Sequence, residues 1–267
     1  MDIRQSKEYA SYMGFYGWKV YRIKDVNYFV KKIFNVGICL KIQRPATIDT
    51  LTIQKLVKKH HILYTIIEPQ NLSTQQPHNF KQIGPYVPSK TLTLDLTKSV
   101  RNLLMECKKD GRYLIRKTDN IQINIDPPIS TFRKVWKRSV SPKRYVTSEK
   151  HLHYLKKAFK KNMIIMLTEE NTNGAIFLKA GNTAYYWHAF SSKTGRKKQA
   201  QYQVVWQGIL WAKQSGAKTF DFEGLYDERF PQDTWKGFTH FKKSFGGKEV
   251  LYPGAFGKWT ILDLLKK

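Results

Sequence analysis

Apolar residues recur along the chain with two periods, one typical of strands and one typical of amphipathic helices. Alternation or a short apolar run predicts strands at residues 18–23, 36–42, 61–68 and 91–96. Helical spacing predicts helices at residues 47–60 and from residue 98 to 110 or beyond, with Thr97 as the N-cap of the second. The polar, proline-containing residues 70–90 are predicted to form a loop.

A second run of elements follows Pro127-Pro128. The pattern predicts helices at 132–140 and 150–160, short strands at 163–168, 175–180 and 183–188, a long helix at 197–215 and a strand at 219–222. Gly216 is the natural C-cap of the long helix. This order of three strands, long helix, strand and helix resembles the GNAT type of acyltransferase fold. We therefore expect an α/β protein in which helices flank mixed sheets.

The charge balance narrows the class of partner. The chain has 47 Lys and Arg against 20 Asp and Glu, a formal net charge of +27. Such a protein attracts polyanions, which include nucleic acid, anionic lipid and phosphorylated small molecules. Because attraction to phosphate is independent of sequence, charge does not choose among them. Basic residues gather in two runs, residues 133–144 and 156–161, and the second includes Lys156 and Lys157.

Cysteines and apolar runs bear on the compartment. Cys39 and Cys107 have no metal-ligand spacing and lie in apolar patterns, so we expect buried free thiols and no metal. No stretch approaches the ~20 apolar residues of a membrane span. The N-terminal residues lack the apolar region of a signal peptide. We expect a soluble cytoplasmic protein, with peripheral contact at an acidic inner leaflet left open.

Residues 212–257 carry the most specific pattern. They place Asp221-Phe222-Glu223-Gly224 at a strand end and Phe241-Lys242-Lys243-Ser244-Phe245-Gly246-Gly247 on the next helix. The stretch resembles the signature of the Fem family of aminoacyl-tRNA-dependent peptidoglycan transferases. Further segments resemble the family in the same order: Gln5-Ser6, Gly17-Trp18, Glu68-Pro69, Pro88-Ser89-Lys90-Thr91, Ile115-Arg116-Lys117 and Trp211-Ala212-Lys213.

The resemblance implies two GNAT-like domains, which we place at residues 1–120 and 121–252, with residues 253–267 returning to the first. It implies two substrates, an aminoacyl-tRNA and a peptidoglycan precursor, either lipid-linked or nucleotide-linked. An amine of the precursor peptide attacks the aminoacyl ester, which forms an amide of the cell-wall cross-bridge and frees the tRNA. No cofactor is implied, and we expect a monomer.

Lys242 is the first candidate for this chemistry. On a helical wheel Phe238, Phe241 and Phe245 share a face, Lys242 lies at its edge, and Lys243 points away. Partial desolvation among aromatic rings lowers the pKa of a lysine. Its cation could neutralise the ester oxyanion or the leaving ribose oxygen. The alternative is a lysine on a core helix whose ammonium group simply reaches water.

Asp221 and Glu223 alternate on one strand, so their side chains are predicted to face one side. Paired carboxylates could deprotonate an ammonium nucleophile or hold it by charge. The alternative is a structural carboxylate that caps a neighbouring helix.

Candidate substrate contacts are aromatic and basic. Phe241, Tyr185 and Tyr186 could contact the substrates, the two tyrosines by stacking on the terminal adenine of a tRNA, with core positions as the alternative. His188 is a weaker acid-base candidate. Arg112 and Arg116 continue a stripe with Arg101 and Lys108 that could hold phosphate or form a solvated helix face.

The start of the long helix bears on the donor. Acetyl-CoA-dependent GNAT enzymes hold pyrophosphate in a glycine-rich turn at this place. Here residues 194–200 contain one glycine, Gly195, among basic residues, which disfavours acetyl-CoA as donor. Two alternatives stay open: a GNAT-derived RNA-binding protein without catalysis, and aminoacyl transfer to another amine acceptor.

Overall fold

The computed structural model describes residues 1–73, 76–140 and 144–260. Their contacts divide the chain into two compact units. Unit 1 comprises Met1–Lys90, Asp227–Pro231 and Leu251–Lys267, and unit 2 comprises Thr91–Tyr226 and Gln232–Val250. The boundary falls at Lys90 rather than near residue 120, because the strand that begins there pairs with a strand of unit 2. Residues 261–267 of the predicted returning segment lie outside the described residues.

Unit 1 is built on a six-stranded mixed sheet with the order β1-β2-β3-β4-β13-β5. Its strands are β1 (Lys19–Ile23), β2 (Val26–Ile33), β3 (Gly37–Gln43), β4 (Tyr64–Glu68), β5 (Lys81–Ile83) and β13 (Ala255–Trp259). Its helices are the 3-10 helix η1 (Ile3–Gln5), α1 (Lys7–Phe15) and α2 (Thr50–His60). β3 and β4 run parallel because α2 forms the crossover between them.

One part of the core of unit 1 lies between its sheet and α2. Ile53 and Leu56 of α2 pack in one buried cluster with Leu40 and Ile42 of β3, as the helical spacing predicts. Strand β2 has no counterpart among the strands predicted from the sequence. Residues 26–30 of this strand are all buried, so the alternation that marks a strand with one solvated face is missing there.

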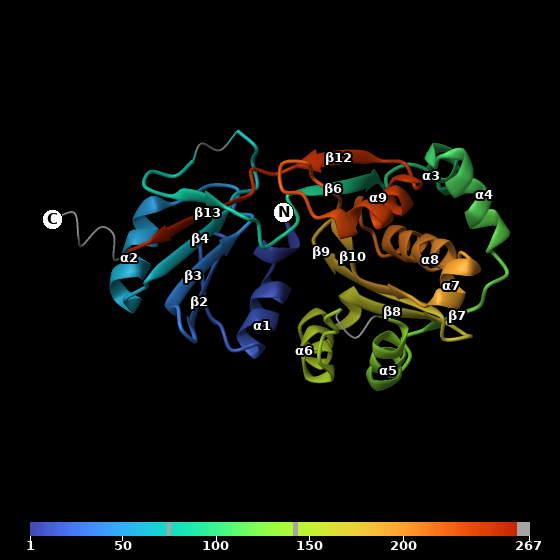
Figure 1. Ribbon diagram of the computed structural model, residues 1–267, viewed down its shortest axis with the longest axis horizontal. Coiled ribbons are helices and arrows are strands. Elements are labelled where there is room, and N and C mark those ends of the chain that lie inside the picture. Colours follow the sequence, from blue (N-terminus) through green and yellow to red (C-terminus); the bar gives the residue numbers. More distant parts are fainter. Residues whose placement is uncertain (74–75, 141–143, 261–267) are drawn as a thin grey trace. The chain divides into compact units, whose positions relative to one another are not determined.

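Unit 2 is built on a seven-stranded mixed sheet with the order β12-β6-β11-β10-β9-β8-β7. Its strands are β6 (Lys90–Asp95), β7 (Ile123–Ile125), β8 (Met163–Thr168), β9 (Asn173–Ala180), β10 (Thr183–Ser191), β11 (Thr219–Gly224) and β12 (Lys248–Leu251). Its helices are α3 (Val100–Glu106), α4 (Lys109–Lys117), α5 (Ile129–Ser139), α6 (Glu149–Phe159), η2 (Lys160–Asn162), α7 (Lys193–Lys197), α8 (Gln201–Gln214), η3 (Asp233–Trp235) and α9 (Lys236–Lys243). Figure 1 shows α8 on one face of this sheet and α5 and α6 on the other.

The long helix α8 is the centre of the unit 2 core. Val204, Val205 and Ile209 are fully buried in the cluster that also holds Phe177 of β9. Gly208 lies directly over Phe177, where a Cβ atom would overlap the ring. The close approach of helix and sheet at this point therefore requires glycine.

The helix predicted from residue 98 is two helices. α3 ends at Glu106 and is followed by Cys107, whose backbone is extended, and α4 begins after Lys108. The Lys108 N–H donates to the carbonyl oxygen of Ser244 at 2.9 Å, which takes it out of a continuous helix. The N-cap of α3 is Ser99 rather than Thr97, because the Thr97 hydroxyl donates to Asp95 instead. Arg101 is thus on a different helix from Arg112 and Arg116.

Both units consist of a mixed sheet flanked by helices, which confirms the predicted α/β class. Cys39 and Cys107 are free and buried, as predicted, and burial raises the pKa of Cys107 to about 11. Within the described residues, no helix combines the length and the apolarity that crossing a membrane requires.

Candidate active site

The ammonium group of Lys242 lies at the end of β11. Its Nζ donates a hydrogen bond to the carbonyl oxygen of Gly224 at 2.6 Å. The same atom lies 4.8 Å from the ring centre of Phe238 and 5.8 Å from that of Tyr186. Only 8% of the residue is exposed, so the cation is held among aromatic rings at the edge of the core.

Burial and the nearby carboxylates act on this lysine in opposite directions. Desolvation lowers the pKa of Lys242 to about 8, while the charges of Glu223 and Asp221 work to raise it. Desolvation is the larger effect. The pKa of Lys242 therefore lies well below the ordinary lysine value, and the group loses its charge as the pH rises through about 8.

The end of β11 is bent at Glu223. Its φ of 58° lies in the left-handed region, which is rare for a residue other than glycine. The Asp221 carboxylate supports the bend by accepting the backbone N–H of Glu223 at 2.7 Å and the hydroxyl of Thr91. The strand alternation expected for Asp221 and Glu223 is therefore broken. Asp221 is buried and Glu223 is half-buried.

The site lies where two parallel strands lose their pairing. β10 and β11 are in register from Thr183↔Thr219 to Tyr185↔Asp221. Beyond this point β10 has an irregularity between Tyr186 and His188, and β11 has one between Asp221 and Gly224 in its pairing with β6. The carboxyl ends of parallel strands next to a change of strand direction are where ligands bind in open α/β sheets.

Helix α9, which ends at Lys243, is fixed by aromatic residues on the helix and directly after it. Phe245 is fully buried against Phe222, and its ring stacks on Tyr202 at 5.5 Å between centroids. Phe241 is half-buried and packs edge-on against Tyr202 at 4.9 Å. Lys243 points to a different partner, the Glu249 carboxylate. The structure therefore separates the two neighbouring lysines as the helical wheel predicts.

Tyr185 and Tyr186 occupy core positions, with exposures of 2% and 8%. The Tyr186 hydroxyl accepts a hydrogen bond from Gln201 at 2.8 Å, and burial raises its pKa. These rings present little surface for stacking, so their core alternative fits the structure better. Half-buried His188 lies 5.2 Å from the Trp136 ring, and desolvation lowers its pKa to about 4.

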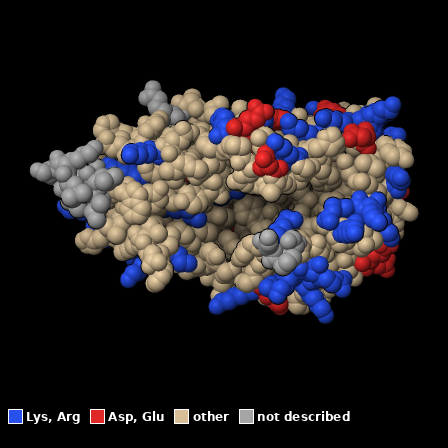
Figure 2. All heavy atoms as spheres, viewed as in Figure 1, with Lys and Arg blue, Asp and Glu red and all other residues tan. Residues whose placement is uncertain are grey.

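The basic candidates lie on the surface of unit 2. Arg112 is half-exposed and donates to the Met105 carbonyl oxygen at 2.9 Å, while Arg116 is exposed on the same helix. Lys156 is tied to Asp126 at 2.9 Å, and Lys157 is exposed. Lys143 of the first basic run lies outside the described residues. Figure 2 shows Lys and Arg gathered over α5 and over α7.

The segment that would cradle a pyrophosphate in an acetyl-CoA enzyme forms the short helix α7. Gly195 is buried there against Asn173, where a Cβ atom would overlap the amide. Close packing against Asn173 therefore accounts for the glycine at position 195. Among the described residues there is no group of His, Cys, Asp and Glu side chains that could hold a metal ion.

A second basic and aromatic cluster, which the sequence analysis missed, lies in unit 1. Lys41 Nζ is 4.5 Å from the ring centre of Trp18, and Lys31 Nζ is 5.7 Å from the same ring. Desolvation, with Arg4 and Lys31 adding to it, lowers the pKa of Lys41 to about 8 against the opposing charge of Glu68. The signal available in the sequence was one lysine in each of two neighbouring strands, Lys31 and Lys41, together with Trp18 directly after Gly17.

Comparisons with known proteins identify the fold. No protein-family model matches the sequence, and no curated protein matches it. FemX has a TM-score of 0.81 at 14% sequence identity, with 99% of this chain and 94% of FemX covered. L-PGS from Bacillus licheniformis has a TM-score of 0.61 at 13% identity, with 96% and 88% covered. A tandem GNAT protein from the clavulanic acid biosynthesis pathway has a TM-score of 0.50 at 7% identity, with 88% and 78% covered.

These similarities define the class: the protein has a two-domain GNAT-like fold. Within that class its fold is that of FemX, which confirms the predicted resemblance to the Fem family at the level of structure. Similarity at these identities shows a shared fold.

Proposed function

We propose that this protein is an aminoacyltransferase that moves an amino acid from aminoacyl-tRNA to an amine of a peptidoglycan precursor peptide. The observation that carries the proposal is the Lys242 cation. It is 8% exposed, bonded to Gly224 and next to two carboxylates, at the carboxyl end of the β10 and β11 pair, in a chain with the fold of FemX. Such a position suits a reaction in which negative charge develops on oxygen.

The reaction needs positioning and charge stabilisation rather than a covalent intermediate on the protein. The neutral amine attacks the ester carbonyl carbon, a C–N bond forms, and the carbonyl oxygen becomes an oxyanion. When the intermediate collapses, the C–O bond to the ribose breaks, and the proton lost by the amine is balanced by one gained by the ribose oxygen. Lys242 would neutralise the oxyanion or the departing ribose oxygen with a charge already held in place.

Glu223 and Asp221 have different parts in this proposal. Glu223 is half-buried beside the Lys242 charge and would attract the acceptor ammonium and receive its proton. Asp221 is buried and accepts two hydrogen bonds that fix the bend at Glu223, which makes it a positioning residue. Phe238, 36% exposed over the Lys242 ammonium, is the aromatic ring that a bound substrate would meet.

The donor is proposed from the charge of unit 2. Exposed basic side chains follow α5 and its neighbours: Lys134, Lys137, Arg138, Lys157, Lys160 and Lys161. A large phosphodiester such as tRNA matches this density of charge better than a compact cofactor. A transfer assay identifies the amino acid that is moved, the amine that accepts it and the carrier of the precursor.

A transfer assay tests the proposal. The protein is incubated with a panel of labelled aminoacyl-tRNAs and with nucleotide-linked or lipid-linked muropeptide, and new amides are sought by mass spectrometry. A new amide on a muropeptide amine supports the proposal. Tight tRNA binding with no amide on any muropeptide would favour the RNA-binding alternative, and an amide only on unrelated amines would favour the other acceptor class.

A further inference from the structure

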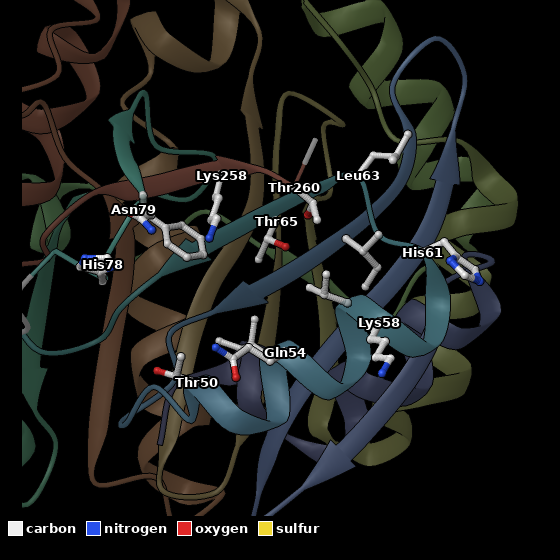
Figure 3. A pocket seen from close by; sticks show the side chains of 14 residues that line it. Thr50, Gln54, Lys58, His61, Leu63, Thr65, His78, Asn79, Lys258 and Thr260 are labelled. Atoms are coloured by element: carbon white, nitrogen blue, oxygen red, sulfur yellow. The ribbon is translucent and has the colours of Figure 1, made fainter. Parts of the chain in front are cut away.

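Unit 1 contains a groove that the proposed chemistry does not use. It has a volume of about 710 Å³ and lies between α2, the segment around Phe80 and strand β13. Val57, Ile62, Leu63 and Phe80 give it an apolar lining. Figure 3 shows Lys258 on β13 across the groove from Gln54 and Lys58 on α2. The volume falls within the range of pockets that hold small organic ligands.

The charge of the groove has one sign. Lys58 and Lys258 line it together with two histidines, and none of the described residues that line it is acidic. Lys58 is exposed at the end of α2, so its ammonium group can meet a ligand at the mouth of the groove. Lys258 Nζ lies 6.0 Å from the ring centre of Phe80, which brings a cation next to the apolar lining.

We propose that this groove binds an anionic membrane lipid, with one hydrocarbon chain against Val57, Leu63 and Phe80 and the phosphate against Lys58. The groove and such a lipid are complementary, because an apolar lining below cations fits a ligand that is itself apolar with an anionic end. A nucleic acid offers the charge without the chain. This inference goes beyond the proposed function and does not rest on it, since lipid binding is measured without tRNA or transfer.

Vesicle binding by the full chain tests the proposal. The probes are vesicles of phosphatidylglycerol in phosphatidylcholine, vesicles of phosphatidylcholine alone, soluble dodecyl phosphate and inorganic phosphate. We expect binding to the phosphatidylglycerol vesicles and competition by dodecyl phosphate, and neither binding to phosphatidylcholine nor competition by inorganic phosphate. Competition by inorganic phosphate as strong as by dodecyl phosphate would overturn the proposal, because the chain would then contribute nothing.

Two matched pairs of variants on α2 place the binding in the groove. Lys58 lines the groove and Lys55 does not, yet both are exposed. Lys58→Glu should weaken vesicle binding about tenfold, and Lys55→Glu should weaken it less. Gln54→Trp puts a ring into the groove and should strongly weaken vesicle binding, whereas Lys55→Trp should leave it intact.

Three results would contradict the assignment. Equal losses in Lys58→Glu and Lys55→Glu would mean that α2 adsorbs to the bilayer by general charge. Unchanged vesicle binding in Gln54→Trp would place the hydrocarbon chain elsewhere. A dimer in solution that Gln54→Trp disrupts, without lipid, would make a second copy of the chain the occupant. Gln54, Lys55 and Lys58 are exposed, so each variant should fold, and thermal unfolding checks that it does.

Discussion

Lys242 Nζ and the Gly224 carbonyl oxygen are 2.6 Å apart, which ties helix α9 to the end of strand β11. The bond satisfies one of the three donors of the ammonium group at a point where the strand has left its regular pairing. The carbonyl holds the cation without neutralising it. The protonated lysine therefore places its positive charge at the end of β11, close to the charges of Glu223 and Asp221.

The first prediction is that Lys242→Met lowers transfer at least ~10-fold, about 1.4 kcal/mol of transition-state stabilisation. Methionine keeps the apolar stem that packs near Phe238 and Tyr186 and removes only the charge. The affinity for tRNA should stay nearly unchanged. Single-turnover transfer rates and tRNA binding, measured on the same preparations, check both parts.

Lys243→Met is the matched control on the same helix. Its partner is the Glu249 carboxylate, and both side chains are about one-third exposed, so the pair contributes little to stability or to the site. The control should retain nearly full activity. Equal losses in the two variants would mean that α9 supplies only general positive potential.

The second prediction concerns pH. The pKa of Lys242 is lowered to about 8 by desolvation, so the cation is lost as the pH rises through that value. If the cation acts in transfer, the rate at saturating substrate falls above about pH 8, after rising at lower pH as the acceptor amine loses its proton. Lys242→Arg keeps its charge at these pH values and should lose the alkaline decline, whatever its absolute rate. An unchanged alkaline limb in Lys242→Arg would assign that limb to another group.

The lowered pKa of Lys242 also predicts how the stability of the protein changes with pH. A lysine whose pKa is lower in the folded than in the unfolded protein makes the unfolded state bind more protons between the two values. The Lys242 contribution to the free energy of unfolding should therefore increase from about pH 8 to the ordinary lysine value of 10.5. Urea unfolding of the wild type and of Lys242→Met across this window measures it, and the difference between the two proteins should change with pH in that direction.

The third prediction is that tRNA binding depends strongly on salt and on α5. Charge reversal of the exposed Lys134, Lys137 and Arg138 should weaken binding across tRNA sequences. The slope of log K against log salt should fall by about 0.9 for each phosphate that these side chains no longer neutralise. Lys156 is left unchanged because its ammonium group already pairs with Asp126.

Reversal of three exposed lysines of unit 1, Lys32, Lys55 and Lys59, is the control of equal charge. It should have a smaller effect on tRNA affinity than the α5 variant. Equal effects would mean that net charge alone drives binding, and binding that ignores salt would count against a tRNA donor.

The fourth prediction tests the packing of unit 2. Gly208→Ala places a Cβ atom in the Phe177 ring and should destabilise the protein by about 1–3 kcal/mol. Gly237→Ala in α9 meets nothing within 4 Å and should stabilise that helix by up to about 1 kcal/mol. Urea denaturation measures whether the free energy of unfolding falls in Gly208→Ala and rises in Gly237→Ala. A tolerated Gly208→Ala would contradict the close approach of α8 and β9.

Elements with a strong period were predictable from the sequence. The amphipathic helix around Ile53 and Leu56, the long helix with Val205 and Ile209, and the edge position of Lys242 all follow from residue spacing. Strand β2 did not, because its buried residues 26–30 show no alternation. The period of apolar residues shows which face of an element is buried. It gives no signal where both faces are buried.

Contacts between distant parts of the chain account for the rest. The break at Lys108 depends on Ser244, and the support of the bend at Glu223 depends on the hydroxyl of Thr91. Neither partner has a local signal in the sequence. Glu223 itself gives no hint of a positive φ, since the residues that favour that region are glycine, asparagine and aspartate. The candidates Asp221, Glu223 and Lys242 could therefore be proposed from the sequence, whereas the backbone geometry that arranges them could not.

The most direct test of the account is a single-turnover reaction with excess protein, followed both by loss of the aminoacyl ester and by gain of amide on the muropeptide. The account predicts that ester loss and amide gain occur at one rate and in equal amounts, and that Lys242→Met slows both together at least ~10-fold while Lys243→Met slows neither. Ester that stays intact on bound tRNA, or that is lost to water with no amide formed, would contradict it.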